Sequence, residues 1–269
     1  MLSQFKEKEM NIGIYVNPNN DNTRALSLIN KQIKERKLIL DNDNPDVVIF
    51  AGGDGTFLRC VQHYHDKLDQ IKLVGINFGN LGFFYDFEKN ELGELFDSLE
   101  NGMYKEITYP LLHANLGYEN RIEKIFAVNE IRIENPFHTL ICDVYIDDIK
   151  LETFRGNGLM VCSPLGSSAY NKSLGGTLID HKLRAIELTE IGGIQNNITH
   201  SIASSLVLNG DSHIRFEADF QKLVVGYDFL NSQEHNPQTI EIFLSNEYVH
   251  LLVKKDHSYV KSLKRAFVK

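Results

Sequence analysis

An aspartate, Asp54, stands among glycines in the segment 52–56, whose sequence is GGDGT. A β-branched apolar run at 47–50 precedes the segment and an amphipathic stretch follows it, a pattern that predicts a strand, a tight turn and a helix. The backbone amides of such a turn point outward at the start of the helix, where they can bind phosphate. The residues expected to bind phosphate are Gly52, Gly53, Gly55 and Thr56.

Asp54 is unexpected in a phosphate-binding turn, because a carboxylate repels phosphate. Two functions would account for it: the carboxylate holds Mg²⁺, or it accepts a proton from a hydroxyl nucleophile. A purely structural explanation is also open, since aspartate is a common helix N-cap and glycine and aspartate both favour turns. The loop lacks the lysine of a Walker A motif and the glycine spacing of a dinucleotide fingerprint, so neither assignment applies.

The first hundred residues alternate between strand-like and helix-like segments. Strands are expected at 12–16, 47–50 and 73–77, and helices at 25–33 and 92–99. Such alternation predicts an α/β domain with a parallel sheet, in which ligands bind at the carboxyl ends of the strands. The aspartate of the glycine turn falls at one of these ends.

The remainder of the chain has a different character. From about 107 to 253 it shows short alternating apolar runs with turn signals at brief intervals, which predicts an all-β domain. The tail at 254–269 is basic and is expected to pack back on the first domain. The expected domains are therefore 1–107 together with 254–269, and 108–253.

Two further groups of polar residues could contact a ligand. Asn129 and Glu130 follow an apolar strand and would present an amide and a carboxylate at its end, although an ordinary polar strand end has the same composition. The segment 155–176 is too rich in Gly, Ser and Asn to be core, and it predicts a long loop that is either structural or binds a nucleoside. Phosphate could be met there by Arg155 or Lys172, and Asn171 and Ser173 belong to the same segment.

Composition limits the classes of function. The formal net charge of −8 argues against binding to nucleic acid or to an anionic membrane. A polar N-terminus and the lack of an apolar run of about 20 residues predict a cytoplasmic protein. The three cysteines fit neither a disulfide framework nor a zinc cluster. A hydrolase is not supported, because the sequence at 166–169 lacks the second glycine of a nucleophile elbow.

Three motifs in this order, GGDGT at 52–56, Asn129-Glu130, and the Gly/Ser-rich stretch at 166–176, closely resemble those of NAD kinases of the bacterial type. The resemblance spans nearly the whole chain and implies transfer of the ATP γ-phosphoryl group to the 2′-hydroxyl of the adenosine ribose of NAD, giving NADP. It implies Mg²⁺ or another divalent cation as cofactor, and a homo-oligomer, either a dimer or a homotetramer. Inorganic polyphosphate stays open as an alternative donor to ATP.

The resemblance also implies roles for individual residues. Asp54 would be the general base at the ribose hydroxyl, with Gly55 beside it, and Asn129 and Glu130 would hold the adenosine ribose. The adenine and nicotinamide pockets would be lined by Ser168, Ala169 and Tyr170, and further NAD contacts, some across a subunit interface, would come from Arg155, Asn157 and Gly192.

The chain departs from the family pattern at three positions. The family commonly has Asp at the position of Asn157, Thr or Ser at that of Leu165, and Thr at that of Ser168. Asn157 can still hydrogen-bond but lacks a charge, so the departure bears on affinity near the nicotinamide. None of the three changes touches the proposed base.

Two other functions compete with this interpretation. A lipid kinase could share the glycine-rich turn, but it would need an apolar acyl pocket and a membrane-facing surface, and the sequence shows neither a basic patch nor an exposed apolar helix. A nucleotide sensor without catalysis is the other, against which the intact Asp54, Asn129 and Glu130 argue.

Overall fold

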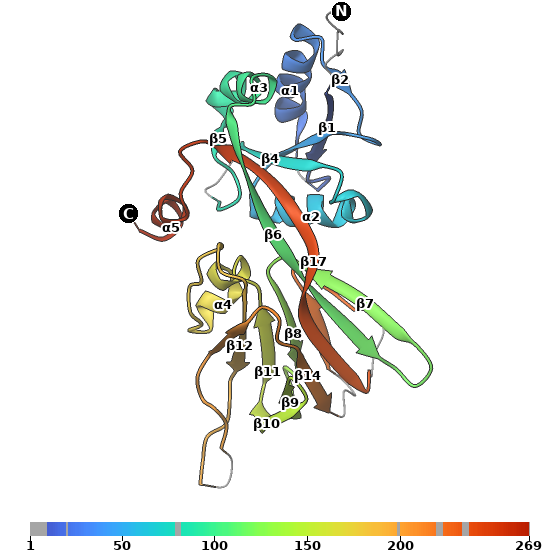
Figure 1. Ribbon diagram of the computed structural model, residues 1–269, viewed down its shortest axis with the longest axis vertical. Coiled ribbons are helices and arrows are strands. Elements are labelled where there is room, and N and C mark those ends of the chain that lie inside the picture. Colours follow the sequence, from blue (N-terminus) through green and yellow to red (C-terminus); the bar gives the residue numbers. More distant parts are fainter. Residues whose placement is uncertain are drawn as a thin grey trace, which may run out of the picture. The chain divides into compact units, whose positions relative to one another are not determined.

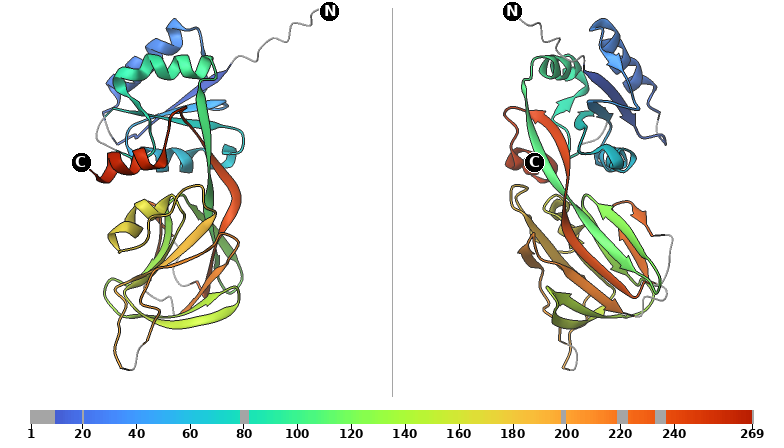
Figure 2. Two further views of the ribbon diagram at one scale, coloured as in Figure 1. Left: turned by 60° about the vertical axis from the view of Figure 1, so that its left-hand side comes forward. Right: turned by 45° about the vertical axis from the view of Figure 1, so that its right-hand side comes forward.

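The computed structural model describes residues 10–19, 21–78, 82–197, 200–218, 223–232 and 237–268. The chain forms two compact units: unit 1 comprises residues 1–108 and 248–269, and unit 2 comprises residues 109–247. Figures 1 and 2 show the elements of each unit. Unit 1 is α/β, unit 2 is rich in β-strands, and the C-terminal residues return to unit 1, which confirms the predicted fold class.

A parallel sheet forms the centre of unit 1. Its strands are β1 (Asn11–Val16), β2 (Ile39–Leu40), β3 (Val47–Ala51), β4 (Lys72–Asn77), β5 (Phe87–Glu88) and the last residues of β17 (Thr239–Lys254). The order is β17-β4-β3-β1-β2, β5 pairs with β4, and all pairings among these strands are parallel. Every residue of β3 is buried, because this strand is central and both faces of the sheet are covered.

Helices cover both faces of this sheet (Figure 1). They are α1 (Thr23–Glu35), α2 (Asp54–His63), α3 (Leu92–Glu100) and α5 (Tyr259–Phe267), with the 3₁₀ turns η1 (His65–Lys67) and η2 (Lys89–Glu91). Helices α1 and α3 share a core with Ile49 of β3. The next residue, Phe50, faces the opposite side, where its ring centroid lies 5.3 Å from that of Phe57 on α2. The predicted helices at 25–33 and 92–99 are α1 and α3.

Unit 2 consists of two antiparallel sheets that share one apolar core. One has the order β13-β12-β11-β8-β15-β16; the other runs β10-β9-β14-β17, with β6 paired to β17 and to β7. The strands are β6 (Tyr104–Gly117), β7 (Ile122–Ala127), β8 (Glu130–Glu134), β9 (Leu140–Ile146), β10 (Ile149–Gly156), β11 (Gly158–Cys162), β12 (Ala185–Ile191), β13 (Leu206–Asn209), β14 (Ile214–Ala218), β15 (Val224–Tyr227) and β16 (Leu230–Asn231); the short helices are η3 (Gly166–Ser168) and α4 (Tyr170–Ser173).

The interpretation of 155–176 as a loop too polar for the core is wrong. Residues 158–162 of this segment form β11, which is buried at every residue and lies between β8 and β12. Leu159 and Val161 belong to the core of unit 2. The apolar run at 159–162 determines this placement, and Gly156, Gly158 and Gly166 are buried because they pack closely on neighbouring backbone.

Strand β17 crosses the expected domain boundary at 253. The two units divide between Glu247 and Tyr248, and the strand continues into unit 1, where Leu251 and Leu252 pair with Leu73 and Val74 of β4. A long strand of 16 residues therefore supplies backbone to both units. The sequence pattern, which changes only after Lys254, does not mark this division.

Candidate active site

In unit 1 the glycine turn joins the end of β3 to the start of α2. Gly52 adopts φ +151°, a conformation that side chains rarely allow, and a Cβ there would overlap Thr56. Gly53 is the N-cap residue, and Cβ atoms built on Gly53 and Gly55 meet nothing within 4 Å. The amides of 53–55 lie where a helix has no intrahelical acceptor for them, so they are available to a phosphate, whereas the amides of Gly52 and Thr56 donate to the carbonyl oxygens of Ile76 and Gly53.

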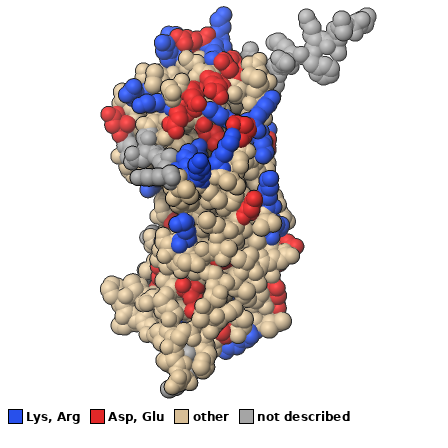
Figure 3. Space-filling model, turned by 90° about the vertical axis from the view of Figure 1, so that its left-hand side faces the viewer, with Lys and Arg blue, Asp and Glu red and all other residues tan. Residues whose placement is uncertain are grey.

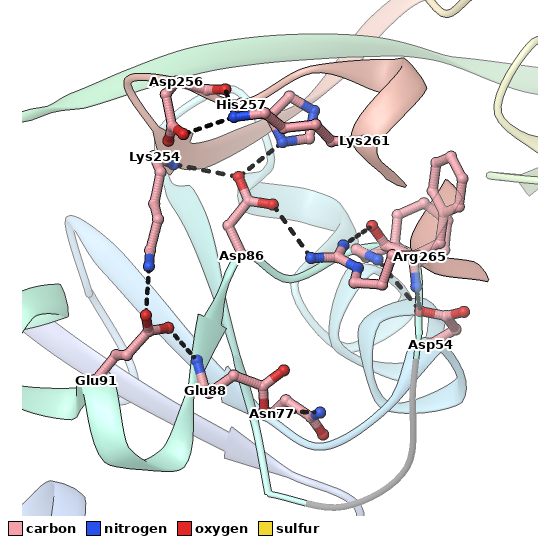
Figure 4. Close-up of polar contacts among 12 residues, drawn as sticks. Asp54, Asn77, Asp86, Glu88, Glu91, Lys254, Asp256, His257, Lys261 and Arg265 are labelled. Atoms are coloured by element: carbon pink, nitrogen blue, oxygen red, sulfur yellow. Dashed lines mark hydrogen bonds and ion pairs between the residues drawn. The ribbon is translucent and has the colours of Figure 1, made fainter. Parts of the chain in front are cut away.

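The Asp54 side chain does not cap the helix. Its Oδ1 instead accepts hydrogen bonds from the backbone amides of Phe83, at 2.7 Å, and Phe84, at 3.2 Å (Figure 4). Among the described residues, no partner is found for its Oδ2. The N-cap explanation of Asp54 is therefore wrong, and one of its carboxylate oxygens is held in place by two backbone amides.

Two opposing effects act on the Asp54 carboxyl group. Burial raises its pKa, and the two amides and the positive charge of Arg265 partly offset this rise. A base with a raised pKa takes up a proton more readily, provided that it is ionised before the reaction. The environment of Asp54 therefore suits a group that accepts a proton.

Phe83, Phe84 and Arg265 are neighbours of Asp54 that the sequence interpretation missed. The two phenylalanines act through backbone amides, which leave no trace in residue type. The glycine before them was a usable signal, because a Cβ on Gly82 would lie 2.6 Å from Oδ1 of Asp54.

In unit 2, Asn129 and Glu130 lie at the turn between β7 and β8. Their backbone is fixed by Asp228, whose carboxylate accepts from the amides of Val128, at 2.9 Å, and Asn129, at 2.7 Å. Both side chains are buried, yet Oδ1 of Asn129 and Oε2 of Glu130 have no hydrogen-bond partner among the described residues. Buried polar atoms without a partner are costly, so these two atoms are candidates for contact with a ligand.

The Glu130 carboxyl group is in an environment that opposes its ionisation. Burial, and then the nearby Asp228 charge, raise the pKa of Glu130 to about 8, although Arg132 acts in the opposite direction. Arg132 lies 3.6 Å from Glu130 Oε1, and its guanidinium is 5.9 Å from the ring centroid of Tyr170. Tyr170 is itself exposed, so its ring is available to stack on a planar ligand group.

The loop after β11 packs directly on this turn. The amide of Ser163 donates to the carbonyl oxygen of Asn129 over 2.9 Å, and its hydroxyl donates to the carbonyl oxygen of Val128 over 2.6 Å. Gly166 contacts the same backbone so closely that a Cβ would overlap the Asn129 carbonyl. The second and third sequence motifs are thus brought together within unit 2.

The other predicted substrate-binding residues occupy varied positions. Asn171 is fully buried, and its amide contacts Glu187 and Thr189, so this side chain supports the loop from inside. At the far end of β11, Asn157 is exposed beside Gly192, which has φ +58°. Ser168, Ala169 and Arg155 are partly buried, and Lys172 and Ser173 are exposed.

In the described part of the chain, no group of three or more His, Cys, Asp or Glu residues is arranged to hold a metal ion. The three cysteines are free and buried. None of the helices in the described ranges is long and apolar enough to cross a membrane.

The chain combines an α/β unit, whose glycine-rich turn carries an aspartate and no Walker lysine, with a β-rich unit. Comparison with known families identifies it further: the ATP-NAD kinase N-terminal domain matches residues 5–104, and the ATP-NAD kinase C-terminal domain matches residues 128–253. The chain belongs to the NAD kinase family.

Individual relatives agree with this assignment. The NAD kinase of Leuconostoc citreum is 33% identical over 260 residues, covering 96% of this chain and 98% of the relative. The NAD kinase of Streptococcus pyogenes is 32% identical over 274 residues, covering 100% of this chain and 98% of the relative.

Two solved structures share the fold. Yeast NADH kinase in complex with NADH superimposes with a TM-score of 0.86 at 19% identity, covering 97% of this chain and 88% of that one. An NAD kinase from Archaeoglobus fulgidus in complex with ATP gives 0.74 at 20% identity, with coverages of 94% and 97%.

Proposed function

We propose that this protein is an NAD kinase that transfers the γ-phosphoryl group of ATP to the 2′-hydroxyl of the adenosine ribose of NAD, giving NADP and ADP. The observation that carries the proposal is the Asp54 carboxylate, which has one oxygen fixed by two backbone amides and the other without a protein partner in the described structure. The NAD kinases of Leuconostoc citreum and Streptococcus pyogenes resemble the chain over nearly its full length.

In this proposal Asp54 acts as the general base. Its Oδ2 accepts the proton of the 2′-hydroxyl while the hydroxyl oxygen forms a bond to the γ-phosphorus and the bond to the β-phosphate oxygen breaks. Phosphoryl transfer has a loose transition state, so most of the acceleration comes from positioning the two substrates. A base held by two amides is positioned before substrate binds.

Asn129 and Glu130 would bind the adenosine ribose. Their unpartnered side-chain oxygens are acceptors, and ribose hydroxyls are donors, so binding would satisfy buried groups that are otherwise costly. The exposed ring of Tyr170 is placed to stack on a base or on the nicotinamide. Ser168 and Ala169 precede this ring in the chain.

Mg²⁺ is proposed as the cofactor that arrives with the donor. The described residues contain no ready-made cage of carboxylates, but Mg²⁺ is commonly held by one or two carboxylates together with substrate phosphates and water. When bound, the ion would neutralise negative charge on the donor phosphates.

A homo-oligomer, either a dimer or a tetramer, is part of the proposal. On the face drawn in Figure 3, unit 2 carries few charged side chains. Interfaces between copies of a chain are depleted of charge at their centres, which supports self-association through this unit. The three free cysteines fit a reducing compartment such as the cytoplasm.

The test combines the purified protein, NAD, Mg²⁺ and ATP, and follows NADP through an NADP-specific dehydrogenase, with Asp54→Asn in parallel. We expect NADP from the wild type and a loss of turnover of about 10²- to 10⁴-fold in the variant, with NAD still bound. Parallel reactions with polyphosphate and with NADH define the donor and the acceptor. A wild type that binds NAD but forms no NADP from either donor would instead be a sensor.

A further inference from the structure

The C-terminal helix α5 contacts the turn that holds Asp54. Nη2 of Arg265 donates a hydrogen bond to the carbonyl oxygen of Phe83 over 3.3 Å. The backbone amide of Phe83 donates to Oδ1 of Asp54 over 2.7 Å. Phe83 is thus held from both sides, by a cation through its carbonyl and by the carboxylate through its amide.

Arg265 is in turn fixed by a nearly buried acid. Oδ1 of Asp86 lies 3.6 Å from Nη1 of Arg265, and the Asp86 side chain is only 11% exposed. Its Oδ2 lies 2.7 Å from Nδ1 of His257 and accepts from the backbone amide of Lys254 over 3.3 Å. Asp86 therefore ties the start and the end of the C-terminal segment to the loop before β5.

Aromatic packing surrounds the same arginine. Its guanidinium carbon is 5.6 Å from the ring centroid of Tyr85, a buried residue, and the Phe83 ring packs edge-on against Tyr259 of α5 at 6.0 Å. Phe84 stacks on Phe57 of α2 at 4.2 Å. These contacts restrict the 83–84 turn to one arrangement relative to the start of α2, where Asp54 lies.

We propose that Arg265, held by Asp86, is a positioning residue for the carboxylate of Asp54. By fixing the Phe83 carbonyl it aims two backbone amides at Oδ1, which turns Oδ2 toward the substrate hydroxyl. The proposal deepens the proposed function and rests on it for the identity of the reaction. Its structural part, the coupling of α5 to Asp54, is independent of that identity.

The proposal also predicts how the charge of Asp54 depends on α5. The titratable groups that face Asp54 are Arg265 and Tyr85, and Asp86 and His257 stand behind Arg265. Arg265 opposes the effect of burial and keeps the pKa of Asp54 from rising further. Loss of Arg265 should therefore raise the pKa of Asp54 and move the acidic limb of the pH profile of kcat to higher pH.

The experiment compares Arg265→Met, Arg265→Lys and Asp86→Asn with the wild type. Lys264→Met is the matched control, because it removes the same charge from the adjacent, exposed position of α5. Each protein is assayed for kcat, for KM with NAD and ATP, and for the pH profile of kcat. The carboxyl pKa of Asp54 is followed separately by ¹³C NMR, and folding is checked by thermal unfolding.

We expect Arg265→Met to lower kcat about 10- to 100-fold with little change in either KM, and to raise the Asp54 pKa in the NMR titration. Arg265→Lys should recover part of both effects, Asp86→Asn should show them more weakly, and Lys264→Met should show neither. An unchanged kcat and Asp54 pKa in a folded Arg265→Met protein would overturn the proposal, as would a rise in KM alone, which indicates substrate binding. If the wild type makes no NADP but Arg265→Met still raises the Asp54 pKa in the NMR titration, the coupling of α5 to Asp54 stands and only the proposed function is rejected.

Discussion

The backbone amide of Asp228 donates to the carbonyl oxygen of Glu130 over 3.1 Å, which keeps two buried carboxyl groups close together in unit 2. Burial raises the pKa of Asp228 to about 6, although the backbone amides that donate to its carboxylate act in the opposite direction. Burial and then the Asp228 charge raise the pKa of Glu130 to about 8. The pair favours protonation of one partner at neutral pH. The raised pKa values therefore favour a neutral carboxyl group beside the proposed ribose site.

This pair makes unfolding stability depend on pH. Glu130 has a higher pKa in the folded chain than its ordinary 4.5, so its favourable contribution is complete below about pH 4.5 and is lost as the pH rises toward about 8. The free energy of unfolding should fall across this window by at most about 1.4 kcal/mol per pH unit from this group. Urea unfolding of wild type and Glu130→Gln at pH 5, 6.5 and 8 measures the difference.

The free energy of unfolding of Glu130→Gln should depend less on pH than that of the wild type, because the substitution removes one titrating group and leaves Asp228. Glu119→Gln, which removes an exposed carboxylate of the same unit, serves as the control and should follow the wild type. Parallel curves for Glu130→Gln and the wild type would mean that Glu130 ionises freely in the folded protein.

NAD binding should release a proton. A ligand that donates hydroxyl hydrogens to Glu130 favours the carboxylate, so binding at neutral pH lowers the pKa of Glu130 below its value of about 8 in the free protein. Calorimetric titration with NAD at pH 7 in two buffers of different ionisation enthalpy counts the protons. Glu130→Gln should release none and bind NAD about tenfold more weakly or worse; equal proton release by both proteins contradicts this role.

Much of the fold could be predicted from local pattern. The alternation before residue 100 and the glycine turn depend on neighbouring residues, so β3, the turn and α2 follow from sequence alone. The prediction for 155–176 failed because the polar composition of the whole stretch hides the buried strand that it contains. Asn171 shows the same limit, since a polar residue in a polar stretch is fully buried where Glu187 and Thr189 satisfy its amide.

The supports of the candidate site could not be predicted, because they join positions far apart in the chain. The amide that holds Asp54 is 29 residues away, the carboxylate that fixes the Asn129 amide is 99 residues away, and Arg265 is 182 residues from the carbonyl it binds. The first contact acts through backbone, which every residue type offers. The sequence therefore identifies the residues proposed to bind or react with substrate better than it identifies the residues that position them.

Gly82 offers a direct test of how tightly Asp54 is held. A Cβ at this position would lie 2.6 Å from Oδ1 of Asp54 and 2.7 Å from the Tyr85 hydroxyl, so Gly82→Ala must displace one of these groups. We expect kcat to fall at least about tenfold because the base is misplaced. Steady-state kinetics should be compared with Gly93→Ala, a helix glycine whose added Cβ meets nothing within 4 Å. A Gly82→Ala protein with full activity would show that the carboxylate tolerates movement.

The family resemblance implies an aspartate at the position of Asn157, and the lack of that charge would have a measurable consequence. The position is exposed, lies beside Gly192, and is implied by the family resemblance to contact the nicotinamide. The ring of NAD carries a positive charge and that of NADH does not. A carboxylate in place of the amide should therefore favour only the oxidised acceptor.

Asn157→Asp should lower KM for NAD about two- to fivefold, the effect expected of one exposed charge pair of about 1 kcal/mol or less, and leave kcat unchanged. KM for NADH should stay the same, so the ratio of the two KM values separates this effect from a general change at the site. Asn246→Asp adds the same charge at another exposed position and should alter neither value. Equal changes with both acceptors would place Asn157 away from the nicotinamide, because only a charge near that ring distinguishes NAD from NADH.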